Sequence, residues 1–141
     1  MRLISISILI LVTVFAQKSN SNISVSGFDS GGAMAQQLGV GYSKTIKAFG
    51  SFAGGAFACY DSSVAGMKSC FNSTFIDYNK INSTFYNMSL DTKIDNITNL
   101  ETSKIVVYVG TADRVVPSTI GTITAKIYDW FSNDTDNVKL I

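Results

Sequence analysis

A glycine-rich turn near the start of this 141-residue chain constrains its fold more than any other feature. Residues 22–26 have the composition of a short strand, and the turn 27–32 contains three glycines. Residues 33–38 then favour a helix. The sequence therefore predicts a strand, a sharp turn and a helix in direct succession, an arrangement that can present one side chain at a helix N-terminus.

The spacing of the glycines indicates which side chain this turn, here called the elbow, presents. Small residues are required two positions before and two positions after it, because the backbone passes close by, and Gly27 and Gly31 meet this requirement around Asp29. Centring the elbow on Ser30 would place Phe28 where a glycine is needed. We therefore expect Asp29 at the apex. The alternative is a tight connection whose aspartate merely caps the helix.

The rest of the chain predicts an α/β fold with a mostly parallel sheet and flanking helices. Continuous apolar runs at 46–52 and 104–109 are typical of strands in a buried parallel sheet. Apolar residues recur at helical spacing over 120–131, and a further strand begins at 137–141. The polar segment 71–103 has little periodicity, so we expect it to form an excursion over the surface.

Residues 1–17 have the features of a secretory signal peptide. Arg2 provides a short basic start, the run 3–15 is apolar, and small residues precede the expected cleavage site. A membrane anchor is the alternative, but the run is shorter than the roughly 20 residues that span a bilayer. We expect a secreted protein whose domain comprises 18–141 and which has no stable membrane insertion once the signal is removed.

Two further features agree with export. Cys59 and Cys70 would lie in an oxidising compartment, where we expect a disulfide between them, and two unpaired buried thiols are the alternative. The chain also contains six Asn-x-Ser/Thr sequences, four of which crowd between residues 72 and 96 and indicate a glycosylated surface segment. These acceptors are Asn22, Asn72, Asn82, Asn87, Asn96 and Asn133.

Composition argues against several classes of function. The net charge of +1 on a weakly charged chain leaves no basic patch for nucleic acid. The sequence contains no histidine, which excludes histidine-dependent triads and His-rich zinc sites. Two cysteines and scattered carboxylates make no ligand cluster. We therefore expect no nucleic-acid partner, no metal and no cofactor.

Several segments follow one another in an order that matches a known enzyme family. They are the elbow and helix at 26–35 and 37–43, Ala53-Gly54-Gly55 with Cys59 and Cys70 behind it, Asn99-Leu100, the strand 106–109 and the loop Gly110-Thr111-Ala112-Asp113-Arg114-Val115-Val116. Together they resemble secreted poly(3-hydroxybutyrate) depolymerases, α/β-hydrolases related to feruloyl and acetylxylan esterases. The resemblance implies a partial α/β-hydrolase fold, an ester or polyester substrate and a triad acid at Asp113.

The sequence departs from the family pattern at the catalytic positions. Asp29 stands where the resemblance places the nucleophilic serine, and no histidine is present to act as a base. Ser30 would contribute its backbone N–H to an oxyanion site or serve as an alternative nucleophile. The resemblance also implies strands before the elbow and a histidine soon after Ile141, so we expect the domain to be incomplete at both ends.

These features predict a depolymerase-like hydrolase for carboxylic esters that is inactive as written. One alternative is a non-catalytic secreted glycoprotein that uses the hydrolase scaffold to bind an ester ligand. The other is attack by the Asp29 carboxylate at an alkyl carbon, as in α/β-hydrolases that displace halide or open epoxides.

Overall fold

The computed structural model describes residues 22–59 and 70–141, and the expected signal peptide lies outside them. Its centre is a sheet of four parallel strands in which sequential strands are neighbours, so the expected α/β fold with a mostly parallel sheet is confirmed. The strands are β1 (Ile23–Phe28), β2 (Ile46–Phe52), β3 (Lys104–Tyr108) and β4 (Val138–Leu140).

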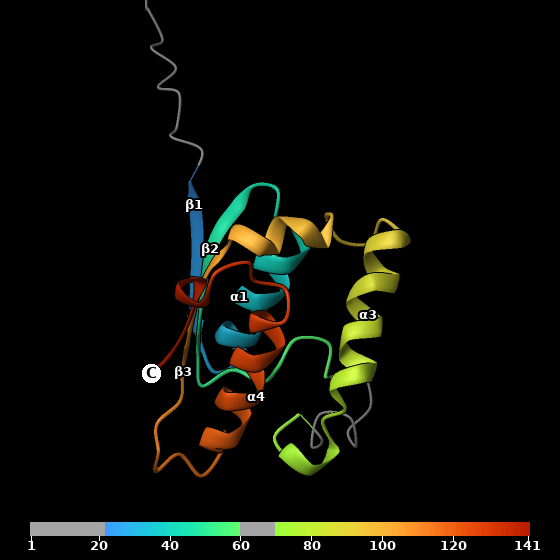
Figure 1. The fold of residues 1–141 in the computed structure, drawn as a ribbon. Coiled ribbons are helices and arrows are strands. Elements are labelled where there is room, and N and C mark those ends of the chain that lie inside the picture. Colours follow the sequence, from blue (N-terminus) through green and yellow to red (C-terminus); the bar gives the residue numbers. More distant parts are fainter. Residues whose placement is uncertain (1–21, 60–69) are drawn as a thin grey trace, which may run out of the picture.

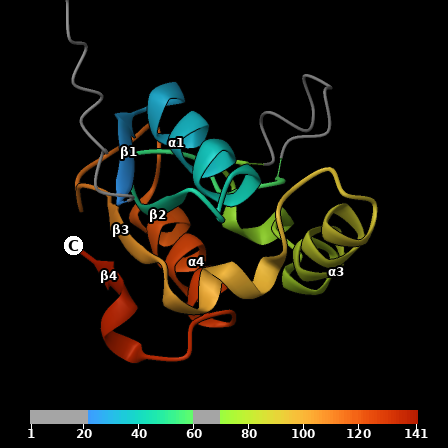
Figure 2. The same ribbon diagram turned by 90° about the horizontal axis from the view of Figure 1, so that it is seen from above.

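Two helices pack directly on one face of this sheet (Figure 1). Helix α1 (Ser30–Gly41) follows β1 and contacts β1 and β2, while α4 (Ser118–Asp129) contacts β3 and β4. A third helix, α3 (Tyr78–Leu90), lies farther from the sheet, beyond α1 and α4 (Figures 1 and 2). Each helix of this first layer thus covers one pair of strands.

The strands end in register, which brings the elbow and the loops after β2 and β3 to one edge of the sheet. Phe28 pairs with Phe52, and Phe52 pairs with Tyr108. Beyond these pairs the ladder continues for one more residue, because the Asp29 N–H donates to the Phe52 carbonyl and the Ala53 N–H to the Tyr108 carbonyl. In open α/β sheets the carboxyl ends of parallel strands are the edge that carries functional groups.

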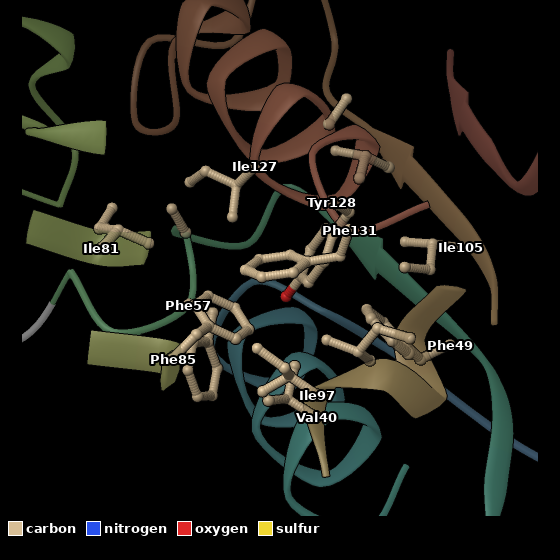
Figure 3. Packing of buried hydrophobic residues seen from close by; sticks show 14 of the residues in the cluster. Val40, Phe49, Phe57, Ile81, Phe85, Ile97, Ile105, Ile127, Tyr128 and Phe131 are labelled. Carbon is tan, nitrogen blue, oxygen red and sulfur yellow. The ribbon is translucent and has the colours of Figure 1, made fainter. Parts of the chain in front are cut away.

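A cluster of aromatic side chains joins the outer helix to the first layer (Figure 3). The Phe85 ring of α3 lies 4.5 Å from that of Phe57 and 4.8 Å from that of Phe131, measured between centroids. Tyr128 of α4 packs edge-on against Phe49 of β2 at 5.1 Å. Burial of each such side chain stabilises the fold by about 1.5–3 kcal/mol, so this cluster fixes α3 against the domain.

The prediction of a surface excursion was wrong over residues 78–90. This segment is α3, which buries Ile81 and Phe85 and begins after Asp77, whose side chain accepts hydrogen bonds from the first backbone N–H groups. Met88 also packs against the core. Farther along the same segment, the short 3-10 helix η2 (Ile97–Thr102) buries Ile97 and Leu100, so the prediction was wrong there too. These apolar positions lie among many polar residues, which hid the helical period. In residues 22–59 and 70–141, no helix combines the length and apolar character that crossing a bilayer requires.

Candidate active site at the elbow

Asp29 is the single residue between β1 and α1, and its backbone is strained. It has φ 56° and ψ −121°, and positive φ values are uncommon for residues other than glycine. Its N–H donates to the Phe52 carbonyl at 2.8 Å, and its carbonyl accepts the first helical hydrogen bond from Ala33 at 3.1 Å. Strain of this kind costs about 1–3 kcal/mol and persists because both flanking elements fix the residue.

The carboxylate of Asp29 is exposed and makes no capping hydrogen bond to α1. The alternative in which this aspartate caps the helix is therefore wrong. Ser30 follows as the first residue of α1 and is also exposed, so two polar side chains stand at the helix N-terminus. Anionic groups are favoured at that end of a helix, where backbone N–H groups are unpaired.

Close backbone contacts explain most, but not all, of the glycines in this region. A Cβ atom on Gly27 would collide with the backbone of Gly31. One on Gly32 would lie 2.9 Å from the Phe52 carbonyl oxygen, and one on Gly54 would lie 2.7 Å from the first turn of α1. Gly31 faces open space. The expected steric requirement is thus present before Asp29, whereas the position two residues after it tolerates a side chain.

A cavity of about 690 Å³ opens beside the elbow. Most of its wall is apolar, and Asp29 is the one charged side chain among the described residues that line it. The wall combines the start of α1, the segment after β2 and part of α3. Its residues are Asp29, Ser30, Ala33, Met34, Gln37, Gly55, Ala56, Phe57, Ala58, Cys59, Cys70, Phe71, Thr84 and Met88.

The predicted disulfide between Cys59 and Cys70 is present and forms part of this wall. It joins two cysteines whose Cα atoms lie 5.2 Å apart, across a sequence separation of 11 residues. In the chain-entropy model, closing so short a loop stabilises the folded state by about 3 kcal/mol. The disulfide packs on Gly55, where a Cβ atom would lie 3.7 Å from the Cys59 Sγ.

Asp113 lies in the loop after β3, at the same edge of the sheet as Asp29. Its Oδ1 accepts hydrogen bonds from the backbone N–H groups of Val115 at 2.8 Å and Val116 at 2.9 Å. This arrangement is typical of an aspartate that stabilises its own turn. Asp113 does not line the cavity beside Asp29. Its role as a triad acid stays a prediction.

The possible glycosylation sites differ in their exposure. Asn82 is 92 % buried in α3, and its side-chain Oδ1 has no hydrogen-bond partner among the described residues. The other five acceptor asparagines are exposed: Asn22, Asn72, Asn87, Asn96 and Asn133. Glycosylation at these positions stays a prediction, and the folded chain offers no room for a glycan at Asn82.

Sequence reasoning missed a fully buried amide next to the site. Gln36 of α1 has no exposed surface and makes hydrogen bonds to three other parts of the fold. Its Nε2 donates to the Ser51 Oγ at 2.9 Å and the Gly55 carbonyl at 2.7 Å, and its Oε1 accepts from the Tyr128 hydroxyl at 2.9 Å. The available signal was its position, because Gln36 shares the buried side of α1 with Gly32, Ala35, Gly39 and Val40.

Comparison with known proteins identifies relatives of this chain. No family model matches it. A poly(3-hydroxybutyrate) depolymerase of Delftia acidovorans is 36% identical over 110 residues, which are 76% of this chain and 22% of the relative. A polyhydroxybutyrate depolymerase of Talaromyces funiculosus is 34% identical over 111 residues, which are 76% of this chain and 31% of the relative.

Solved structures agree with the sequence comparison. The crystal structure of the PHB depolymerase from Penicillium funiculosum superposes with a TM-score of 0.76 at 30% identity, covering 86% of this chain and 37% of that protein. A PHB depolymerase complexed with an R3HB trimer gives the same values. The chain thus spans between about a fifth and two fifths of the length of these relatives. It is a homologue of poly(3-hydroxybutyrate) depolymerases over a part of their length, and its sheet and flanking helices correspond to that part of their α/β fold.

Proposed function

We propose that this chain binds an uncharged ester or polyester segment in the cavity beside Asp29 and does not hydrolyse it. The observation that carries the proposal is the strained backbone of Asp29, with φ 56° and ψ −121°, at an apolar cavity of about 690 Å³. The turn has the shape that presents a nucleophile in hydrolases, while the residue that it presents is a carboxylate.

The chemistry of the cavity wall supports an ester as ligand. Apolar side chains such as Met34, Phe57 and Phe71 supply most of the surface, and Asp29 is its one charged side chain among the described residues. An uncharged chain with alternating alkyl and ester groups suits such a wall better than an anionic ligand, because no positive side chain among the described lining residues would compensate the desolvation of an anion. The relatives are named depolymerases, and one of them forms a complex with an R3HB trimer.

The identity of residue 29 argues against ester cleavage. Attack by the Asp29 carboxylate on an acyl carbon would give a tetrahedral intermediate, whose collapse to product would form a mixed anhydride and release an alkoxide. The carboxylate is the better leaving group, so the intermediate returns to the starting ester. Ser30 lies next to it as the first residue of α1, so the elbow presents the aspartate and not the serine at its apex.

Export is the second part of the proposal. The apolar N-terminal segment with the features of a signal peptide, the exposed glycosylation acceptors and the disulfide support a secreted glycoprotein. A disulfide of this kind persists outside the cytosol, so the two cysteines that line the cavity would stay linked there.

Binding of an R3HB trimer, measured by titration calorimetry, tests the proposal. Met34→Asp introduces a charge into the cavity and should weaken binding by about tenfold or more, because the carboxylate loses water when the ligand binds. Leu38→Asp is the matched control, since Leu38 lies one turn further along α1 and does not line this cavity. Its effect should stay within about twofold. No binding by the unmodified chain, or equal effects of both substitutions, would contradict the proposal.

A further inference from the structure

The buried amide of Gln36 lies directly behind the elbow cavity. Its side chain leaves α1 below the elbow and reaches the end of β2 at Ser51, the segment after β2 at Gly55 and the end of α4 at Tyr128. Both N–H groups donate and the carbonyl oxygen accepts, so the amide is well satisfied although it is completely buried. One side chain therefore connects three separate parts of the fold.

The hydroxyl group of Tyr128 is a dependable donor in this network. Figure 3 shows its oxygen inside the hydrophobic cluster, and the residue is only 1 % exposed. Burial raises the pKa of Tyr128 well above its ordinary value, so the phenol remains protonated through the neutral range. Because the amide oxygen of Gln36 can only accept, this hydrogen bond runs from the Tyr128 hydroxyl to the amide carbonyl.

Stability alone does not require an amide at this position. Apolar residues of similar shape can replace a satisfied buried polar group at little cost, provided that its partners change with it. What an apolar side chain cannot supply is a directed bond to the Gly55 carbonyl. This bond is short, 2.7 Å, and Gly55 belongs to the wall of the cavity.

The segment that contains Gly55 needs to be held in place. Two alanines in it have positive φ, 50° at Ala53 and 57° at Ala58, and each such conformation costs about 1–3 kcal/mol. The segment is fixed at its start by the hydrogen bond from Ala53 to Tyr108, at 2.7 Å, and at its end by the disulfide of Cys59. Gln36 holds the middle.

Contacts on the other side show which movement the Gln36 bond prevents. Gly54 already lies so close to α1 that a Cβ atom there would come within 2.7 Å of the Ala33 nitrogen. The segment therefore cannot approach the elbow more closely. Without the bond from Gln36 to Gly55, the strained segment could move away from α1 and widen the cavity.

We propose that Gln36 is a positioning residue for the cavity beside Asp29, because it holds the segment 53–59 through the Gly55 carbonyl at the distance that a ligand requires. The part of this inference that concerns ligand binding rests on the proposed function. Its structural half, the restraint of the segment by Gln36, can be measured without any ligand.

Hydrogen exchange of backbone amides provides that measurement. Gln36→Met removes both donors, while the control Tyr128→Phe removes one hydrogen bond of Gln36 and leaves its bond to Gly55. We expect Gln36→Met to speed exchange at residues 54–58 by about tenfold relative to β3, which corresponds to the loss of one hydrogen bond. Tyr128→Phe should change that ratio by less than about threefold.

Equal acceleration in the segment 54–58 and in β3 would show that Gln36 acts only on global stability and would overturn the proposal. If Gln36→Met does not fold, Gln36→Leu replaces it, because leucine likewise has no donor for the Gly55 carbonyl, and the same ratio is expected. At a temperature where all variants are folded, Gln36→Met should also weaken R3HB trimer binding by about tenfold, and Tyr128→Phe by less than about twofold. If the unmodified chain does not bind the trimer, the proposed function is contradicted. The hydrogen-exchange ratio would still decide whether Gln36 restrains the segment.

Discussion

The backbone N–H of Asp29 donates a 2.8 Å hydrogen bond to the carbonyl oxygen of Phe52, which ties the apex of the elbow to the last residue of β2. The same carbonyl lies 2.9 Å from the position that a Cβ atom on Gly32 would take. Strand end, elbow and first helical turn thus meet around one oxygen atom. This crowding fixes the positive φ of Asp29, because any relaxation would break the hydrogen bond.

The two glycines that flank the elbow should respond differently to alanine. In Gly27→Ala the new Cβ meets the Gly31 backbone, which cannot move aside, so we expect the free energy of unfolding to fall by about 1–3 kcal/mol. Gly31→Ala is the matched control, because its Cβ enters open space in the first turn of α1. It should be neutral or stabilising by up to about 1 kcal/mol. Urea denaturation measures both, and similar losses would contradict the packing.

Hydrolysis should depend on the residue at the apex of the elbow. Asp29→Ser supplies a hydroxyl nucleophile, and imidazole in the buffer can stand in for the missing histidine base. With imidazole present, we expect Asp29→Ser to cleave p-nitrophenyl butyrate about tenfold or more above Asp29→Ala, and the unmodified chain to match Asp29→Ala. Equal rates for the serine and alanine variants would mean that the elbow does not present residue 29 to an ester.

The sheet and the helices that pack on it could be predicted because their signals are local. Runs of apolar residues such as 46–52 and 104–109 became β2 and β3 with errors of at most one residue. Helix α4 (Ser118–Asp129) was predicted from a stripe of apolar residues at helical spacing. Helix α3 and the short helix η2 (Ile97–Thr102) were missed, because in both the few buried apolar residues lie among many polar ones.

The surroundings of the site depended on contacts that no local pattern reveals. Gln36 bonds to partners 15, 19 and 92 positions away in the sequence, so its role becomes visible only once α1, β2 and α4 are packed. Likewise, the glycine pattern located the elbow, but only the folded backbone shows that a side chain has no space at Gly27 and has open space at Gly31. Disulfide formation between Cys59 and Cys70 could be predicted from export and their short separation.

Of the two glycosylation acceptors in α3, only one should carry a glycan. Asn87 is exposed, whereas Asn82 is 92 % buried, so a glycan there would force the helix off the core. In folded protein recovered from a eukaryotic secretory host, we expect glycopeptides at Asn87 and none at Asn82. Mass spectrometry should therefore show a mass loss of one glycan for Asn87→Gln and none for Asn82→Gln. A glycan on Asn82 in folded protein would contradict the packing of α3.

Stability should fall at alkaline pH because of Tyr128. Burial raises the pKa of its hydroxyl well above the ordinary value in the folded chain, while in the unfolded chain it stays near about 10. Above that pH the unfolded state releases a proton that the folded state retains. The contribution of Tyr128 to the free energy of unfolding is therefore complete below about pH 10 and is lost at about 1.4 kcal/mol per pH unit as the pH rises towards the folded pKa.

Urea denaturation between about pH 8 and 11 should show this slope as the difference in free energy of unfolding between the unmodified chain and Tyr128→Phe, which lacks the ionisable group. Parallel curves for the two proteins would mean that the hydroxyl is not buried as the structure has it.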